Sequence, residues 1–168
     1  MASISFSKTE RLSLWMQYRI LASLEPTHGY DRLATILERG YTRDYEEVME
    51  SVREELSEED CNFVRDIMCL YFDLQHSYDQ LGEQERAGIE SVDFPGFDMN
   101  DDHEGILLGY ARFLKSPMMF ASLRTASTEF NSHAPMTDLY RAMLGKFNSM
   151  GSPRPRAFTV EQMKTLLR

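Results

Sequence analysis

The chain has few cysteines, a shortage of basic residues and no long hydrophobic run. It contains 168 residues, among them two cysteines, and carries 27 acidic against 18 basic side chains, for a net charge of −9. Broad contact with nucleic acid requires an excess of Lys and Arg, so direct nucleic-acid binding is not expected. No apolar segment is long enough to span a membrane and no signal peptide is visible, so we expect a cytoplasmic protein without membrane contact.

The sequence also lacks the common metal and phosphate motifs. Cys61 and Cys69 are eight residues apart in one predicted helix and cannot form a local disulfide, so reduced thiols are expected. None of the four histidines stands three or four residues from another His or Cys, and no phosphate-binding glycine loop is present. These patterns predict no metal and no cofactor, and they identify no catalytic residue.

One acidic segment resembles the start of a calcium loop. Asp98, Asn100 and Asp102 occupy the first three ligand positions, but His103 stands where the loop needs glycine and Gly109 where it needs glutamate. We therefore expect an acidic helix start, in which the carboxylates lie at the positive end of the helix dipole.

Helical periodicity dominates the sequence, and no alternating pattern predicts a sheet. We expect an all-α protein with a single domain over residues 1–168, about eight helices and one long central helix. Residues 1–6 form a tail, residues 82–100 a long loop, and residues 151–158 a Pro/Gly linker before the last helix. Capping boxes at Ser7 and Thr159 begin the first and last helices. Thr42 is expected to cap a third helix with an apolar stripe from Tyr45 to Val52, and Pro117 and Pro135 to begin two later ones.

The longest predicted helix begins at Ser57 and carries an apolar seam. Its members recur at spacings of three and four residues: Val64, Ile67, Tyr71, Leu74, Tyr78 and Leu81. A single helix cannot bury such a seam alone, so it is either the core of a helical bundle or an interface with a second copy. The following helix, from Asn100, is expected to turn Ile106, Leu107, Tyr110, Phe113 and Leu114 inward.

The segment from Ile36 to Tyr41 has more detail than a helix end requires. Gly40 supplies a left-handed residue that closes a helix, and Arg39 suits the negative end of the helix dipole. The accompanying Glu38 and Tyr41 have no such local explanation. We expect Arg39 and Tyr41 to pack against residues 94–98, with an Arg39–Asp98 ion pair.

Several strings in a fixed order resemble the YfbU family of small bacterial proteins, from about Ser7 to the C-terminus. They are Glu10-Arg11-Leu12 with Gln17-Tyr18, Tyr30-Asp31-Arg32-Leu33 with Ile36-Leu37-Glu38-Arg39-Gly40-Tyr41, Asp66-Ile67-Met68 with Tyr71, Phe94-Pro95-Gly96-Phe97-Asp98, Gly109-Tyr110-Ala111-Arg112-Phe113, and Phe130-Asn131-Ser132-His133-Ala134-Pro135-Met136. The resemblance implies a multihelical fold, a homo-oligomer and no established reaction. Some relatives look fused to a DNA-binding ribbon-helix-helix segment, which implies a ligand-sensing or regulatory role.

These observations lead to two main hypotheses, with a nucleic-acid partner as a third that the acidic charge disfavours. The first is a non-enzymatic, self-associating regulatory or interaction module that binds a small ligand or a partner protein; it rests on the seam, the many Met and Tyr residues and the missing catalytic frame. The second is a hydrolase or nuclease with a site built from Asp98, Arg112 and the segment Asn131–His133. The residues expected to bind a ligand are Arg39, Tyr41, Asp98, Tyr110, Arg112, Asn131 and His133.

Overall fold

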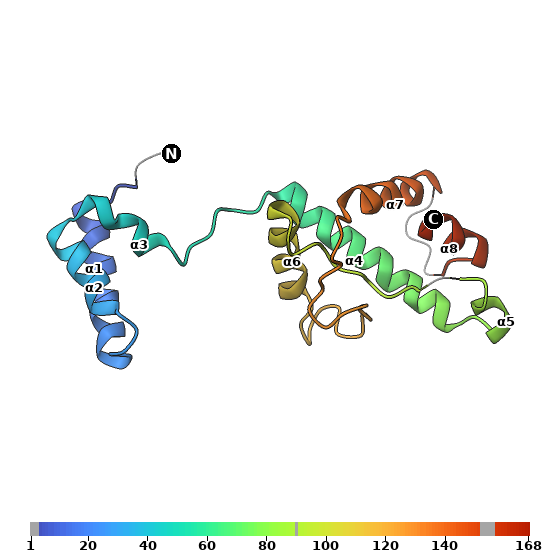
Figure 1. Ribbon diagram of the computed structural model, residues 1–168, viewed down its shortest axis with the longest axis horizontal. Coiled ribbons are helices and arrows are strands. Elements are labelled where there is room, and N and C mark those ends of the chain that lie inside the picture. Colours follow the sequence, from blue (N-terminus) through green and yellow to red (C-terminus); the bar gives the residue numbers. More distant parts are fainter. Residues whose placement is uncertain (1–3, 90, 152–156) are drawn as a thin grey trace. The chain divides into compact units, whose positions relative to one another are not determined.

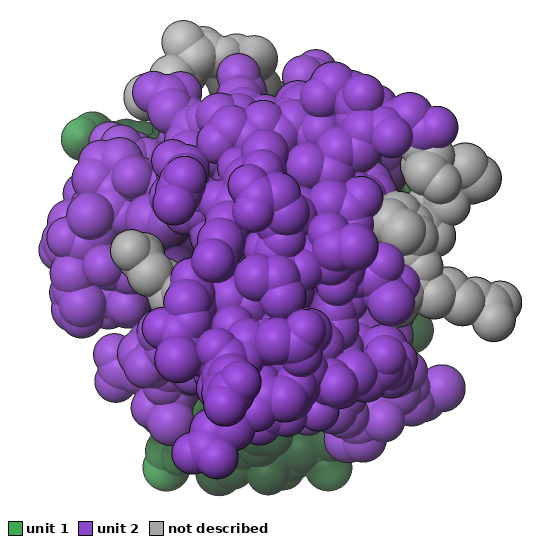
Figure 2. All heavy atoms as spheres, turned by 90° about the vertical axis from the view of Figure 1, so that its right-hand side faces the viewer, with its two compact units in different colours: residues 1–55 green, residues 56–168 purple. Residues whose placement is uncertain are grey.

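The structure, a computed structural model, describes residues 4–89, 91–151 and 157–168. The described residues form eight α-helices and no strand, which confirms the all-α prediction. The chain is organised into two compact units, residues 1–55 and 56–168 (Figure 2). No change of composition in the sequence had indicated this boundary. Most of the predicted linker at 151–158, including Arg154 and Arg156, lies outside the described residues.

Unit 1 is a small helical assembly built on one helix pair. It contains α1 (Lys8–Leu24), α2 (Tyr30–Arg39), the 3-10 turn η1 (Thr42–Asp44) and α3 (Tyr45–Met49). As predicted, Ser7 and Glu10 form a reciprocal capping box at the start of α1. The core is formed by the buried residues Ile36, Leu37, Tyr45 and Val48, with Leu14, Trp15 and Tyr18 of α1 packed against them.

The third predicted helix is shorter than the sequence pattern indicated. A 3-10 turn occupies residues 42–44, without a side-chain cap from Thr42, and α3 ends at Met49. Val52, the last member of the predicted stripe, is therefore exposed outside the helix. The stripe could not continue because a helix of five residues offers little more than one turn of inward-facing surface.

Unit 2 is organised around α4 (Glu58–Asp79), its longest helix. It also contains α5 (Glu83–Arg86), α6 (Asp102–Leu114), α7 (Thr137–Ser149) and α8 (Val160–Leu167). Helices α6 and α7 both pack on α4, and α8 packs on α7 (Figure 1). Val64, Ile67 and Leu74 are fully buried, so the predicted seam on α4 is the core of unit 2 and is not an exposed interface.

Two predictions for α6 were wrong. The helix begins at Asp102, and its N-cap is Asp101 and not Asn100. The Asp101 carboxylate accepts hydrogen bonds from the backbone N–H groups of His103 and Glu104. Ile106 and Phe113 are not inward: they are 55% and 76% exposed. The apolar residues of α6 that are buried in the core are Leu107, Leu108, Ala111 and Leu114. The buried face is therefore rotated around the helix relative to the predicted one.

Two predictions based on proline were also wrong. No helix begins at Pro117, because Ser116 and Met119 exchange two backbone hydrogen bonds and close a tight turn around it. Helix α7 begins at Thr137, two residues after Pro135. The final helix agrees with its prediction, since Thr159 and Gln162 form the expected capping box.

Aromatic rings occupy the centre of unit 2. Phe94 contacts Phe97, Phe130, Tyr71 and Tyr140, and its ring centroid lies 5.2 Å from Tyr71 and 5.8 Å from Tyr140. The Tyr140 hydroxyl donates a 2.7 Å hydrogen bond to the carbonyl of Gly96. Burial raises the pKa of both tyrosines above the ordinary value of 10.0, because an apolar environment disfavours the charged phenolate.

Alkaline pH is expected to destabilise the protein through these phenols. Above about pH 10 the unfolded chain releases protons that Tyr71 and Tyr140 keep in the folded chain, so the free energy of unfolding falls as the pH rises; below that range they have no effect. Urea unfolding followed by circular dichroism should show the fall. Tyr71→Phe should reduce its slope, whereas Tyr41→Phe, at an exposed position, should not; an equal effect of both would contradict the assignment.

Candidate functional site

The residues predicted to bind a ligand lie in both units. Arg39 and Tyr41 are exposed in unit 1, at the end of α2, whereas Asp98, Tyr110, Arg112, Asn131 and His133 belong to unit 2. The expected Arg39–Asp98 pair would join the two units and stays a prediction. Within unit 2 the structure brings Asp98, Asn131 and His133 into one cluster of loops, and places Arg112 in a different set of contacts.

The end of α2 has a partner that the sequence did not indicate. Gly40 adopts a left-handed conformation with φ 69°, and its N–H donates to the carbonyl of Ile36. The Arg11 guanidinium from α1 donates to the Leu37 carbonyl at 3.4 Å. A Cβ at Gly40 would stand 2.2 Å from Nη1 of Arg11. Gly40 therefore closes the helix and also leaves room for a cation at the negative end of α2.

Asn131 joins two loops through its side-chain amide. Its Oδ1 accepts the backbone N–H of Met99 at 3.2 Å and that of His133 at 3.1 Å. These two donors identify Oδ1 as the oxygen, so Nδ2 donates to Nδ1 of His133 at 3.2 Å. His133 itself is exposed and has a left-handed backbone with φ 56°. The neighbouring Ser132 hydroxyl donates to the Ala134 carbonyl, so Ser132 and His133 do not form a nucleophile–base pair.

The Glu104 carboxylate accepts four hydrogen bonds, although the sequence indicated Glu104 only as part of an acidic helix start. It is buried, although it lies in the first turn of α6. Oε1 accepts the backbone N–H groups of Met136 and Thr137, at 2.7 and 2.6 Å, and the Thr137 hydroxyl at 2.7 Å. Oε2 accepts the N–H of Asp98 at 2.8 Å. One carboxylate thus joins α6, the 94–100 loop and the start of α7.

Asp98 completes this arrangement with hydrogen bonds inside its own loop. Its Oδ1 accepts the backbone N–H of Asn100 at 2.9 Å and the Asn100 amide at 3.0 Å. These are the bonds of a local Asx-type turn, which uses the carboxylate on its own loop. Within residues 4–89, 91–151 and 157–168, no three His, Cys, Asp or Glu side chains are grouped so that they could hold a metal ion.

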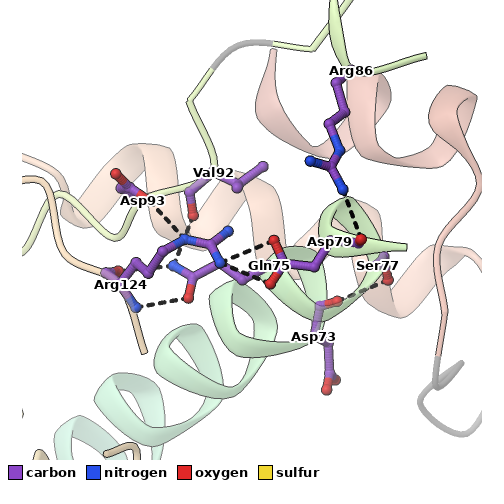
Figure 3. A network of polar contacts seen from close by, with 8 residues as sticks. All are labelled: Asp73, Gln75, Ser77, Asp79, Arg86, Val92, Asp93 and Arg124. Atoms are coloured by element: carbon purple, nitrogen blue, oxygen red, sulfur yellow. Dashed lines mark hydrogen bonds and ion pairs between the residues drawn. The ribbon is translucent and has the colours of Figure 1, made fainter. Parts of the chain in front are cut away.

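A second polar network joins α4 to the same loops (Figure 3). The buried Gln75 amide donates to the carbonyls of Val92 and Arg124, and its oxygen accepts the Arg124 N–H at 2.8 Å. The Arg124 guanidinium pairs with Asp79 at 2.8 Å and with Asp93 at 3.3 Å. These pairs hold the pKa of Arg124 above its ordinary value, Asp79 having the larger effect. A buried polar side chain thus provides hydrogen-bond partners for backbone groups of loops that are not paired in a regular sheet.

Arg112 lies at the other end of α6. Its Nε and Nη2 atoms both donate to the Glu129 carbonyl. The half-buried Tyr110 stacks on the exposed Phe113, with ring centroids 6.0 Å apart. Arg112 and Lys115 line a surface hollow of about 370 Å³ together with Thr125, Thr128 and Phe130. No sequence pattern indicated Lys115 or the two threonines, because they come together only when the 120–131 loop folds against α6.

Helix α1 has an apolar face that unit 1 does not cover. Its four members recur every fourth residue and are more than half exposed, at 57%, 53%, 58% and 71%: Leu12, Met16, Ile20 and Leu24. We call this set the α1 face. At 100° per residue it lies opposite the side formed by Leu14, Tyr18 and Ala22, which packs within unit 1. The sequence pattern indicated the packed side but not this second one.

The fold and these contacts define a small all-α protein of two helical units, in which buried polar side chains hold long loops in place. None of the described helices combines the length and hydrophobicity that crossing a bilayer requires. A model of the YfbU domain matches residues 4–167, so the chain belongs to the YfbU family. It is also similar to the UPF0304 protein MJECS11 of Methanocaldococcus jannaschii, at 36% identity over 149 residues that cover 85% of this chain and 88% of that protein.

Removal of the Glu104 charge is expected to destabilise unit 2. In Glu104→Gln an amide N–H₂ replaces one oxygen and faces a backbone N–H, so a buried donor loses its acceptor; we expect a loss of about 2–4 kcal/mol. Urea unfolding followed by circular dichroism measures it. Glu129→Gln removes the same charge at an exposed position and should change stability by less than about 0.5 kcal/mol. Equal losses in the two variants would contradict the role given to Glu104.

The contact between Gly96 and Phe130 provides a second test of the loop arrangement. Gly96 has φ 90°, and a Cβ there would stand 1.8 Å from the carbonyl oxygen of Phe130. Gly96→Ala should therefore lower the free energy of unfolding by about 3 kcal/mol or more. Gly145→Ala, in α7 with nothing within 4 Å of the added methyl, should instead be neutral or stabilise by up to about 1 kcal/mol. Wild-type stability in Gly96→Ala would show that the loops can separate freely.

Proposed function

We propose that this protein is a non-enzymatic interaction module that self-associates through the α1 face. The observation that carries this proposal is that face itself: four large apolar side chains on one helix, each more than half exposed. Single exposed apolar residues are common on protein surfaces, but a continuous row of them is typical of an interaction surface. The regulatory role that the family resemblance implies would act through this association.

The composition of the face favours a second copy as its occupant. It contains no charge, and the residues between its members include Ser13 and Ser23, which are small enough for another helix to approach. A twofold axis would place the same uncharged row on both sides of the interface. Rows spaced by four residues pack into each other at a crossing angle of about −50°, so two copies of α1 would meet most closely near Met16 and Ile20 and diverge toward Leu12 and Leu24.

Magnitudes indicate a weak association. Completing the burial of four half-exposed apolar side chains contributes about 1 kcal/mol each, or about 8 kcal/mol for two copies. Loss of translational and rotational freedom costs about 4–15 kcal/mol, so this face alone supports an equilibrium that depends on concentration. The net charge of −9 on each copy adds repulsion, which salt screens. Association should therefore become stronger as salt is added, opposite to the behaviour of a nucleic-acid complex.

The test is the mass of the particle in solution. Light scattering after gel filtration, from micromolar to near-millimolar protein, should show a monomer–dimer equilibrium that shifts toward dimer when NaCl is added. The double variant Met16→Ser and Ile20→Ser should raise the dissociation constant at least about tenfold. Because both side chains are exposed, its helix content should match the wild type.

Met118→Ser is the matched control, because it removes the side chain of the most exposed methionine of unit 2, which is 94% accessible. It should leave the dissociation constant unchanged. A protein that stays monomeric over the whole concentration range, or a double variant that associates like the wild type, would contradict self-association through α1.

A further inference from the structure

The hollow beside the end of α6 has a lining that differs from the rest of this acidic protein. It measures about 370 Å³ and is bordered by Arg112, Lys115, Thr125, Thr128 and Phe130. Two of these side chains are cations, two carry hydroxyls and none is an acid, in a chain whose net charge is −9. Its size lies within the range of small-molecule sites, about 300–1,000 Å³.

Both cations are held in position by backbone carbonyls of the adjoining loop. Arg112 uses Nε and Nη2 on the Glu129 carbonyl, which fixes the guanidinium plane and leaves Nη1 for another acceptor. Lys115 donates one N–H to the Leu123 carbonyl at 2.7 Å, and its Nζ lies 5.5 Å from the centre of the Phe130 ring. Two further N–H groups of that ammonium stay available. A ligand would therefore meet cations that are already ordered and would lose little side-chain entropy.

The two threonines supply neutral donors on the same hollow. Within the described part of the chain, the hydroxyl of neither Thr125 nor Thr128 takes part in a hydrogen bond. The loop that carries them is anchored by other groups, including the backbone bonds of residues 94 and 126 and the side chain of Gln75. Their hydroxyls are therefore free to donate to an acceptor in the hollow.

We propose that this hollow binds a phosphate group, either as inorganic phosphate or on a small phosphate ester. A guanidinium N–H, an ammonium and two hydroxyls are four separate donors, and a tetrahedral oxyanion has enough oxygens to accept from all of them, whereas a carboxylate has two. The volume exceeds what a phosphate alone needs and leaves room for the esterified group. This site lies in unit 2 and is independent of the α1 face.

Two electrostatic effects oppose the binding of an anion here, and both are limited in range. The C-terminal carbonyls of α6 form the negative end of that helix, but this effect falls off within the last turn. The net negative charge of the chain is screened beyond about 8 Å at physiological ionic strength. Both cations line the hollow itself and no acidic side chain does, so the local charge favours the binding of an anion.

The experiment is a titration of the full chain with inorganic phosphate and, separately, with phenyl phosphate. Amide chemical shifts of residues 125, 128 and 130 are followed by nuclear magnetic resonance, with NaCl keeping the ionic strength constant. We expect saturable shifts at these amides, with a dissociation constant of order 1 mM for phosphate. Tighter binding of phenyl phosphate would identify an ester as the ligand, and equal affinities would identify phosphate itself. Shifts that rise linearly without saturation for both probes would overturn the proposal.

Variants separate a ligand site from a purely structural role of the cations. Lys115→Gln should weaken phosphate binding at least about tenfold. Because it also removes a bond to the loop, the second variant is Thr128→Val, which removes a donor and no internal hydrogen bond and should weaken binding at least about threefold. Arg65→Gln removes one positive charge at an exposed position on α4, outside the hollow, and should leave the affinity unchanged. Equal weakening in Arg65→Gln, or wild-type affinity in both Lys115→Gln and Thr128→Val, would refute a specific site.

Discussion

The carboxylate of Glu104 is the interaction on which the arrangement of unit 2 depends. It is buried and receives four hydrogen bonds, three of them from backbone N–H groups in two separate segments. A buried charge is tolerated only when such donors satisfy it, and the donors in turn would have no other acceptor at the start of α7. The carboxylate therefore ties the first turn of α6 to the 94–100 loop and to α7.

Buried side chains also provide hydrogen-bond partners for loop backbone at a second place in unit 2. Residues 91–101 and 115–136 contain little regular structure, yet they pass close to the core, where Phe94, Phe97 and Phe130 are buried. Their backbone groups are paired through isolated bridges and through Gln75. This arrangement lets aromatic side chains from loops pack beside Tyr71 of α4 and Tyr140 of α7. It also fixes the hollow at Arg112 and Lys115, because both side chains bind loop carbonyls.

The two proposed surfaces have different physical origins. The α1 face arises because α1 is apolar on two opposite sides, of which unit 1 covers one. The hollow arises because a loop that folds against α6 brings hydroxyls next to two cations. As proposed, the first surface would bind apolar groups and the second an anion, so self-association and ligand binding would use no common residue.

Much of the fold was predictable where the cause is local. The capping boxes at Ser7 and Thr159, the glycine end of α2 and the seam on α4 depend on residues within a few positions of each other. The site was predictable only in part. Asp98, Asn131 and His133 belong to adjoining loops, whereas Arg112 makes other contacts, and their role in binding a ligand stays a prediction. Glu104 and Lys115 were missed, because their partners are separated from them by long stretches of chain or belong to a loop without a periodic signal.

The sequence by itself determined the helical class, the family and the helix ends that a local cap or glycine defines, since capping, periodicity and glycine conformation act over a few residues. Only the tertiary structure decided which face of α6 is covered. Ile106 and Phe113 share the apolar character of Leu107 and Leu114, yet they are exposed. An apolar residue is buried only if another segment packs over it, and the position of that segment depends on contacts such as those of Glu104 and Gln75, which join residues distant in the sequence.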